Sequence, residues 1–155
     1  MQREEIYVET SAWSFVFADD EPARKAATER FFNVTRGADL LIAELVIAEI
    51  ELARNPKRDL ILGYIKDRRP NVLPDAKEVT VLAEEYVNRG IIPPKYVADA
   101  LHIAFASYYS LNAIISWNFE HIVKVKTRRE VRAVNTILGY AAPEIATPEE
   151  YTGGI

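Results

Sequence analysis

The feature that most constrains the fold is an alternation of short apolar segments with longer helix-like segments. Apolar segments of strand length occur at about 5–9, 40–42 and 112–116, and "NVLP" at 71–74 is another short one. Helical patterns occupy about 21–36, 43–54, 57–67, 75–89, 93–110 and 127–138. Strands that alternate with helices are typical of a parallel sheet covered on both faces. The sequence therefore predicts an α/β fold, with an edge strand and a turn in the tail "PEIATPEEY".

The length favours one domain. At 155 residues, the chain is long enough for a domain with its own core and too short for two ordinary domains. No apolar run approaches the ~18 residues that a membrane span needs, and "MQREEI" lacks the apolar region of a signal peptide. We therefore expect a single domain over 1–155 that acts in the cytoplasm without a membrane partner.

The composition restricts any metal site to oxygen ligands. The chain has no cysteine, which excludes disulfides and thiolate sites, and its two histidines are too few for a histidine-built site. Oxygen ligands suit Mg²⁺ or Mn²⁺.

A carboxylate stands at the end of the first predicted strand, in "YVETSAW". Glu9 directly follows the apolar residues Ile6 to Val8, and Thr10 and Ser11 come next. Ligands of open parallel sheets bind outside the carboxyl ends of the strands, which is where Glu9 lies. We therefore expect Glu9 in a functional site, with Thr10 and Ser11 orienting its carboxylate or contacting a phosphate.

Glu49 is a second acid in an unexpected place. At 100° per residue along "AELVIAEIELA" (43–53), Glu44 and Glu51 share the polar side of the helix. Glu49 lies inside the apolar arc instead. A structural salt bridge explains this position as well as a functional role does, and this helix alone does not decide between them.

Asp99 stands in a helix that is apolar nearly all round. Between Val97 and Ala106 only Asp99 and His102 are polar, so we expect this helix to be buried. A buried carboxylate is costly unless it is paired, protonated or bound to a metal. We favour a functional role for Asp99. For His102, on the same side of the helix, we favour a structural role over that of a catalytic base.

The last predicted strand, "NAIIS", leads into "WNFEH", which supplies Asn118, Glu120 and His121. Four separate elements thus offer oxygen atoms that could surround a divalent cation, namely those of Glu9, Glu49, Asp99 and Asn118. Clustered acids that hold Mg²⁺ or Mn²⁺ activate water and stabilise the leaving oxygen in metal-dependent hydrolysis.

These segments, taken in order, resemble the PIN-domain family. They are Glu9-Thr10-Ser11, the helical Glu49 in "AELVIAEI", Asp99 in "DALHIAFA", and "SWNFEHI". Within the family the chain is similar to VapC-type toxins of toxin–antitoxin pairs, over nearly its whole length. The resemblance implies an α/β/α sandwich with a central parallel sheet and a ribonuclease that depends on Mg²⁺ or Mn²⁺.

The resemblance also assigns positions. It makes Glu9, Glu49 and Asp99 the acids of the catalytic and metal site. Asn118 stands where many members have a fourth acid, and Glu120 matches a nearby acidic position that supports the site. Most members have Asp at the position of Glu9, although a VapC-like subgroup has Glu. A homodimer and an antitoxin protein as partner are further implications.

A basic segment, "KVKTRREVR" (124–132), follows the Asn118 loop and is the predicted RNA-binding surface. Its basic residues are Lys124, Lys126, Arg128, Arg129 and Arg132. A solvated helix face explains them equally well. With a net charge of −4, an anionic substrate requires a local patch of this kind. For Trp13, Trp117 and Phe119 we expect core packing, with stacking on bases as the alternative.

We therefore predict a metal-dependent endoribonuclease. Glu9 and Asp99 would ligate the cation, and Glu49 would ligate it or position the attacking water. Asn118 would complete the shell. The first alternative is a catalytically degenerate PIN-like domain that binds RNA or a protein partner, which the amide of Asn118 favours. The second is a phosphohydrolase of small phosphoesters, which lacks support because the chain has no Gly-rich phosphate loop.

Overall fold

A five-stranded parallel sheet forms the centre of the molecule. The computed structural model describes residues 3–153. The strand order is β3-β2-β1-β4-β5, and every neighbouring pair is parallel. The strands are β1 (Glu5–Val8), β2 (Asp39–Ala43), β3 (Asn71–Leu73), β4 (Ala113–Ile115) and β5 (Glu144–Ala146). The predicted α/β fold with a parallel sheet is confirmed.

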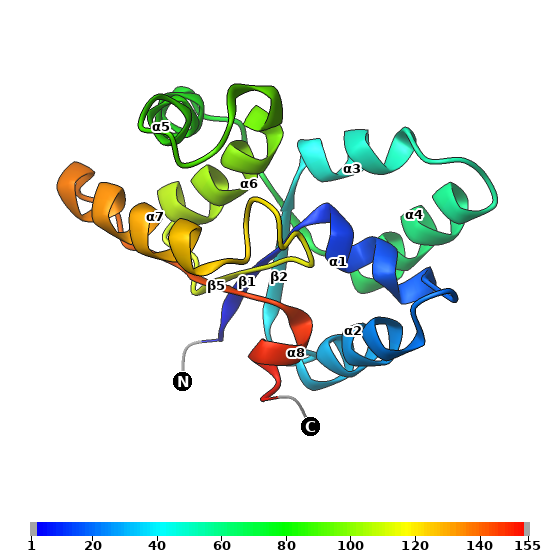
Figure 1. The fold of residues 1–155 in the computed structure, drawn as a ribbon. Helices are drawn as coiled ribbons and strands as arrows, with labels where there is room; N and C mark the ends of the chain where they lie inside the picture. Colours follow the sequence, from blue (N-terminus) through cyan, green and yellow to red (C-terminus); the bar gives the residue numbers. More distant parts are fainter. Residues whose placement is uncertain (1–2, 154–155) are drawn as a thin grey trace.

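Helices cover both faces of this sheet. The helices are α1 (Thr10–Ser14), α2 (Pro22–Val34), α3 (Glu44–Glu51), α4 (Lys57–Arg68), α5 (Lys77–Asn88), α6 (Val97–Tyr108), α7 (Val125–Leu138) and α8 (Pro148–Tyr151), with 3-10 turns η1 (Phe15–Phe17) and η2 (Pro94–Tyr96). In Figure 1, α5, α6 and α7 lie on one side of the sheet, and α2, α4 and α8 lie on the other. This is the expected α/β/α sandwich. None of the described helices is long and apolar enough to span a membrane.

The structure adds two elements that the sequence pattern did not predict. The first strand ends at Val8, and α1 and η1 follow it directly. They are too short to show a helical period, and α1 begins because the side chain of Glu9 caps it. In the tail, the predicted edge strand is β5. The predicted turn is the short helix α8, which a capping box of Thr147 and Glu150 begins.

The strand order places Glu9 at the point where the direction of strand addition reverses. The chain adds β2 and β3 on one side of β1, and then β4 and β5 on the other. This reversal is the topological switch point, where open α/β sheets bind ligands. Ile6, Tyr7 and Val8 are fully buried, because β1 is the central strand with helices on both faces. The residues that follow β1 therefore start from a rigid position.

Candidate metal centre

Glu9 is held at the carboxyl end of β1 by neighbouring hydroxyl groups. Its Oε1 accepts hydrogen bonds from the backbone N of Ser11 (3.2 Å), from Ser11 Oγ (2.5 Å) and from Ser116 Oγ (2.7 Å). Ser116 directly follows β4, so two neighbouring strand ends converge on one carboxylate. Glu9 is only 5% exposed. All three hydrogen bonds fall on Oε1 and leave Oε2 outside this network.

Glu49 belongs to a second network, which links four elements of the fold. Its Oε1 accepts hydrogen bonds from Thr10 Oγ1 (2.5 Å) and from His102 Nε2 (2.7 Å). The other ring nitrogen of His102, Nδ1, lies 2.7 Å from the hydroxyl of Tyr7, and His102 is 0% exposed. As with Glu9, the two hydrogen bonds fall on one carboxylate oxygen. Thr10 and Ser11 therefore serve different acids, Thr10 holding Glu49 and Ser11 holding Glu9.

The network keeps Glu49 ionised. Burial opposes the charge of Glu49, but the hydrogen bond and charge of His102 and the hydrogen bond from Thr10 outweigh it and lower its pKa below the ordinary 4.5. Burial opposes the charge of His102 as well. The bond to Glu49 and the negative potential of Glu9, Glu49 and Asp99 nevertheless raise the pKa of His102 above 6.5.

Asp99 lies in the first turn of α6, in a different environment. Its Oδ2 accepts a hydrogen bond from His121 Nδ1 (3.0 Å), and the backbone N of His121 donates to Asn118 Oδ1 (2.9 Å). The ring of Tyr96 packs on His121 with 4.1 Å between centroids. Burial raises the pKa of Asp99 above 3.8, against the charge of His102 and the hydrogen bonds of His121 and Asn118. Asn118 and Asp99, predicted to share a site, are therefore neighbours.

Glu9, Glu49 and His102 approach one another as the ligands of a cation would. One possible ligand atom from each lies within 4.8 Å of the others. Asp99 is not a member of this group, although it precedes His102 by one turn on α6. Both nitrogens of His102 already face protein groups, so the carboxylate oxygens of Glu9 and Glu49 are the atoms free for a cation. Such hard oxygen ligands fit Mg²⁺ or Mn²⁺.

Sequence reasoning missed several residues of this region. Tyr7, Tyr96 and Ser116 were not predicted to take part, and His121 was noted without a role. A signal for Ser116 was present, because it ends its strand as Glu9 ends β1. The predicted supporting residue Glu120 points outward, with its side chain 78% exposed and its carboxylate 3.6 Å from His121 Nε2.

The predicted RNA-binding residues separate into two kinds. Lys126 pairs with Glu130 (2.8 Å) and donates to the carbonyl of Gly90, and Arg128 pairs with Glu150 (2.8 Å) and donates to the carbonyl of Ile145. These two side chains have internal partners. Within residues 3–153, Lys124 and Arg129 form no ion pair. Arg132 of the same segment forms no ion pair within these residues either, so Lys124, Arg129 and Arg132 are the cations of the segment left for an external anion.

Together, the fold and the clustered acids define an α/β domain with a candidate cation site at the carboxyl ends of a parallel sheet. The chain belongs to the PIN-domain family, whose model matches residues 6–124. The predicted family resemblance is confirmed.

A solved structure agrees with this assignment. The fold is similar to the crystal structure of VapC20 of Mycobacterium tuberculosis, a toxin that cleaves the sarcin-ricin loop. The TM-score is 0.56 at 16% sequence identity, over 88% of this chain and 96% of that chain. At this identity the similarity shows the fold alone. No curated protein matches the chain in sequence.

Proposed function

We propose that the protein is a metal-dependent endoribonuclease, built as one PIN-like domain over residues 1–155. The observation that carries this proposal is the approach of Glu9 and Glu49, each held through one oxygen, whose possible ligand atoms lie within 4.8 Å of each other, with Asp99 one turn before His102 on α6. Buried carboxylates that approach one another repel unless a cation or proton lies between them. Protonated His102 supplies one compensating positive charge, and a bound cation would compensate the second carboxylate, which supports a resident cation.

Glu9 and Glu49 would hold Mg²⁺ or Mn²⁺, with Asp99 and Asn118 completing the site from α6 and the following loop. When bound, such a cation acts as a Lewis acid and lowers the pKa of a coordinated water. The chain's own residues do the rest. Ser11 and Ser116 fix the orientation of Glu9, and Thr10 and His102 fix that of Glu49. His121, which donates to Asp99 Oδ2, fixes the orientation of that carboxylate.

RNA is the proposed substrate, and Lys124 and Arg129 would contact its phosphates. Both belong to the segment that follows the Asn118 loop, which supports a path of the strand from this segment to the acids. Each phosphate contact releases a counterion, and the affinity for RNA should therefore fall as salt rises. Replacing either cation by Gln should reduce the slope of log affinity against log salt by about 1.

The test is cleavage of a labelled single-stranded RNA with Mn²⁺, with Mg²⁺, or with excess EDTA. Glu9→Gln should abolish cleavage while retaining the circular dichroism spectrum and melting transition of a folded protein. Glu44→Gln, at an exposed position of α3, is the matched control and should cleave normally. Full activity in EDTA would refute the proposal. RNA binding that needs neither metal nor Glu9, with no cleavage, would favour the degenerate binding domain instead.

We further propose that the protein acts in the cytoplasm as a homodimer and is the toxin of a toxin–antitoxin pair. The family resemblance supports both partners. Exposed apolar side chains also favour association, since Leu52 is 86% exposed on leaving α3 and Leu60 is 51% exposed on α4. Light scattering after gel filtration should give the dimer mass. A monomer throughout the micromolar range would contradict the dimer and leave the nuclease proposal standing.

A further inference from the structure

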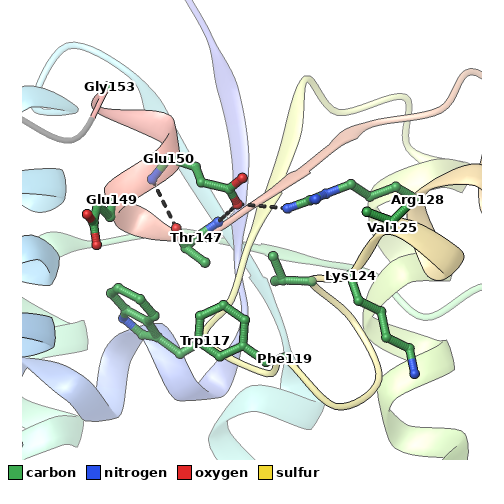
Figure 2. Close-up of a pocket in the computed structure, with 10 residues that line it drawn as sticks. Trp117, Phe119, Lys124, Val125, Arg128, Thr147, Glu149, Glu150 and Gly153 are labelled. Carbon is green, nitrogen blue, oxygen red and sulfur yellow. Dashed lines mark hydrogen bonds and ion pairs between the residues drawn. The ribbon is translucent and has the colours of Figure 1, made fainter.

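A cavity of about 650 Å³ lies between the loop that follows β4 and the short helix α8. Figure 2 shows that the loop of Trp117 and Phe119 lines one side, Lys124 and Arg128 another, and the short helix α8 a third. The volume falls within the about 300–1,000 Å³ that is common for small-molecule sites. One loop contributes to both the cavity and the candidate metal centre, because Asn118 lies between Trp117 and Phe119 in the chain.

The two aromatic residues of this loop have different roles. Trp117 is 6% exposed, and its Nε1 donates to Thr28 Oγ1 (2.9 Å), which anchors it in the core. Its backbone N donates to Ser11 Oγ (2.8 Å), the same hydroxyl that holds Glu9. Phe119 is 47% exposed and has no such anchor. Trp117 therefore fixes the loop to the metal centre, and Phe119 presents an accessible ring beside it.

The Phe119 ring is held in place although it is exposed. The guanidinium of Arg24, on α2, lies 5.1 Å from its centroid and 5.5 Å from that of Trp117. Trp117 also contacts Phe119 edge-on, with 6.1 Å between centroids. A ring that is fixed before binding loses little side-chain entropy when a ligand stacks on it. This makes Phe119 a preformed stacking surface.

The charges around the cavity are nearly balanced. Arg128 pairs with Glu150, whose carboxylate also accepts from the backbone N of Thr147 (Figure 2). Lys124 stands at one side and the acidic Glu149 at another. A balanced, mostly apolar space suits an uncharged planar group better than a phosphate, which would meet the two glutamates. Lys124, which forms no ion pair within residues 3–153, can meet a phosphate at the edge.

We propose that this cavity binds a nucleobase of the RNA strand, stacked on Phe119, next to the phosphate that lies at the metal centre. The proposal rests on the proposed ribonuclease function and names a subsite of that same site. Base–aromatic stacking tolerates all four bases, because each has a π-face. The Phe119 subsite would therefore position the strand for cleavage and would not by itself select a sequence.

The test compares two labelled strands of about twelve nucleotides, a length that covers common single-strand sites, in excess EDTA to prevent cleavage. One is single-stranded RNA of mixed sequence, and the other carries abasic tetrahydrofuran residues throughout and keeps the phosphates. Fluorescence anisotropy gives both affinities. Wild-type protein should prefer the RNA. Phe119→Leu should lower the affinity for RNA roughly 5- to 100-fold, the range of one lost stacking contact, and leave the affinity for the abasic strand unchanged. Phe119→Trp should retain the preference, and Val81→Ala, an exposed residue on α5, is the control.

Each outcome decides the proposal. Equal losses for both strands, or no loss with Phe119→Leu, would overturn it. A Phe119→Leu protein that binds RNA normally but fails to bind a protein partner would assign the cavity to that partner. Cleavage by wild-type protein with Mn²⁺ tests the ribonuclease function separately from the base subsite. If cleavage occurs while Phe119 has no effect, only the subsite fails. If no cleavage occurs, the proposed function fails.

Discussion

Helix α6 contributes one member to each of two acid–histidine pairs at the carboxyl edge of the sheet. In the inner pair, His102 of α6 donates to Glu49 of α3 at 2.7 Å. In the outer pair, Asp99 of α6 accepts from His121 of the following loop at 3.0 Å. The inner histidine is wholly buried against Tyr7, whereas the outer one packs under the partly exposed ring of Tyr96.

The same pairing has opposite effects on the two acids. Glu49 has a lowered pKa because His102 and Thr10 together outweigh its burial. Asp99 has a raised pKa because burial outweighs its partners. A carboxylate beside an imidazole is thus not one kind of site. The number of donors and the depth of burial decide whether the acid is held as an anion or can take up a proton.

The largest expected effect is on catalysis, where both pairs should matter. Glu49→Gln and Asp99→Asn should each reduce Mn²⁺-dependent RNA cleavage roughly a thousandfold, since each removes one charge from the proposed metal site. The pairs should differ in stability. Glu49→Gln should lower the free energy of unfolding in urea, and Asp99→Asn should leave or raise it, because ionised Asp99 is unfavourable in its buried site. Glu51→Gln, exposed on α3, is the matched control. If Glu49→Gln and Asp99→Asn changed the free energy of unfolding equally, the proposed difference between the two pairs would be wrong.

Removing each histidine should separate the pairs by stability. His102→Leu leaves the buried hydroxyl of Tyr7 and the carboxylate of Glu49 without their partner, which should cost about 3 kcal/mol of unfolding free energy. His121→Leu leaves one acceptor, Asp99, without this donor, and because Asp99 keeps its hydrogen bond with Asn118 the change should cost about 1 kcal/mol. Urea denaturation at pH 6 measures both. If His121→Leu lost more unfolding free energy than His102→Leu, the outer pair would be the more important one for stability, contrary to this prediction.

The inner pair should also set a stability window in pH without added metal. The lowered pKa of Glu49 gives stability that is present above its ordinary 4.5 and is lost as pH falls through the folded value below it. The raised pKa of His102 gives stability that is present below 6.5 and is lost as pH rises through the folded value above it. The Glu49–His102 pair should therefore contribute most to the free energy of unfolding between pH 4.5 and pH 6.5.

Asp99 should act in the opposite direction at the acid end. Its raised pKa gives stability that is present below 3.8 and is lost as pH rises through the folded value. Urea denaturation from pH 3 to 9 measures the sum of these contributions. In the double variant Glu49→Gln with His102→Gln, the free energy of unfolding should change less with pH around 4.5 and around 6.5. In Asp99→Asn, its decrease with pH above 6.5 should remain. If the free energy of unfolding of the double variant still fell with pH above 6.5 as in the wild type, the role of His102 would be contradicted.

The smallest expected effect concerns the outer pair alone. Tyr96→Leu removes the ring that packs on His121 and should reduce cleavage about threefold, in line with the loss of one aromatic contact. It should leave the urea transition unchanged, because Tyr96 is itself partly exposed. Val97→Ala, the exposed neighbour at the start of α6, is the control. A large loss of stability would show that the outer pair is as structural as the inner one.

Local sequence patterns were sufficient to predict the parallel sheet and to single out the candidate acids. The alternation of apolar strands with helices predicted the parallel sheet, because parallel strands require crossovers. The helical period placed Glu49 among apolar residues, and the composition of α6 marked Asp99. These are properties of one segment at a time, so one sequence can show them. The short α1 escaped prediction because a helix of five residues spans less than two turns.

Only the tertiary structure decided which side chains meet. Thr10 and Ser11 are adjacent in sequence, yet one holds Glu49 and the other Glu9. Tyr7 and His102 are 95 residues apart and share a buried hydrogen bond. Periodicity determines the face on which a residue lies, but the partner across that face depends on how separate elements pack.

The same limit applies to the basic segment and the aromatic loop. The sequence gives no sign that Arg128 pairs with Glu150 while Arg129 forms no ion pair within the described residues, because Glu150 lies on a helix 22 residues later. It also treats Trp117 and Phe119 alike. Packing buries the first against Thr28 and leaves the second beside the cavity. The chain alone thus determined the residue types that could form a metal site, and the packing of α1, α3, α6 and β4 determined how they are held together.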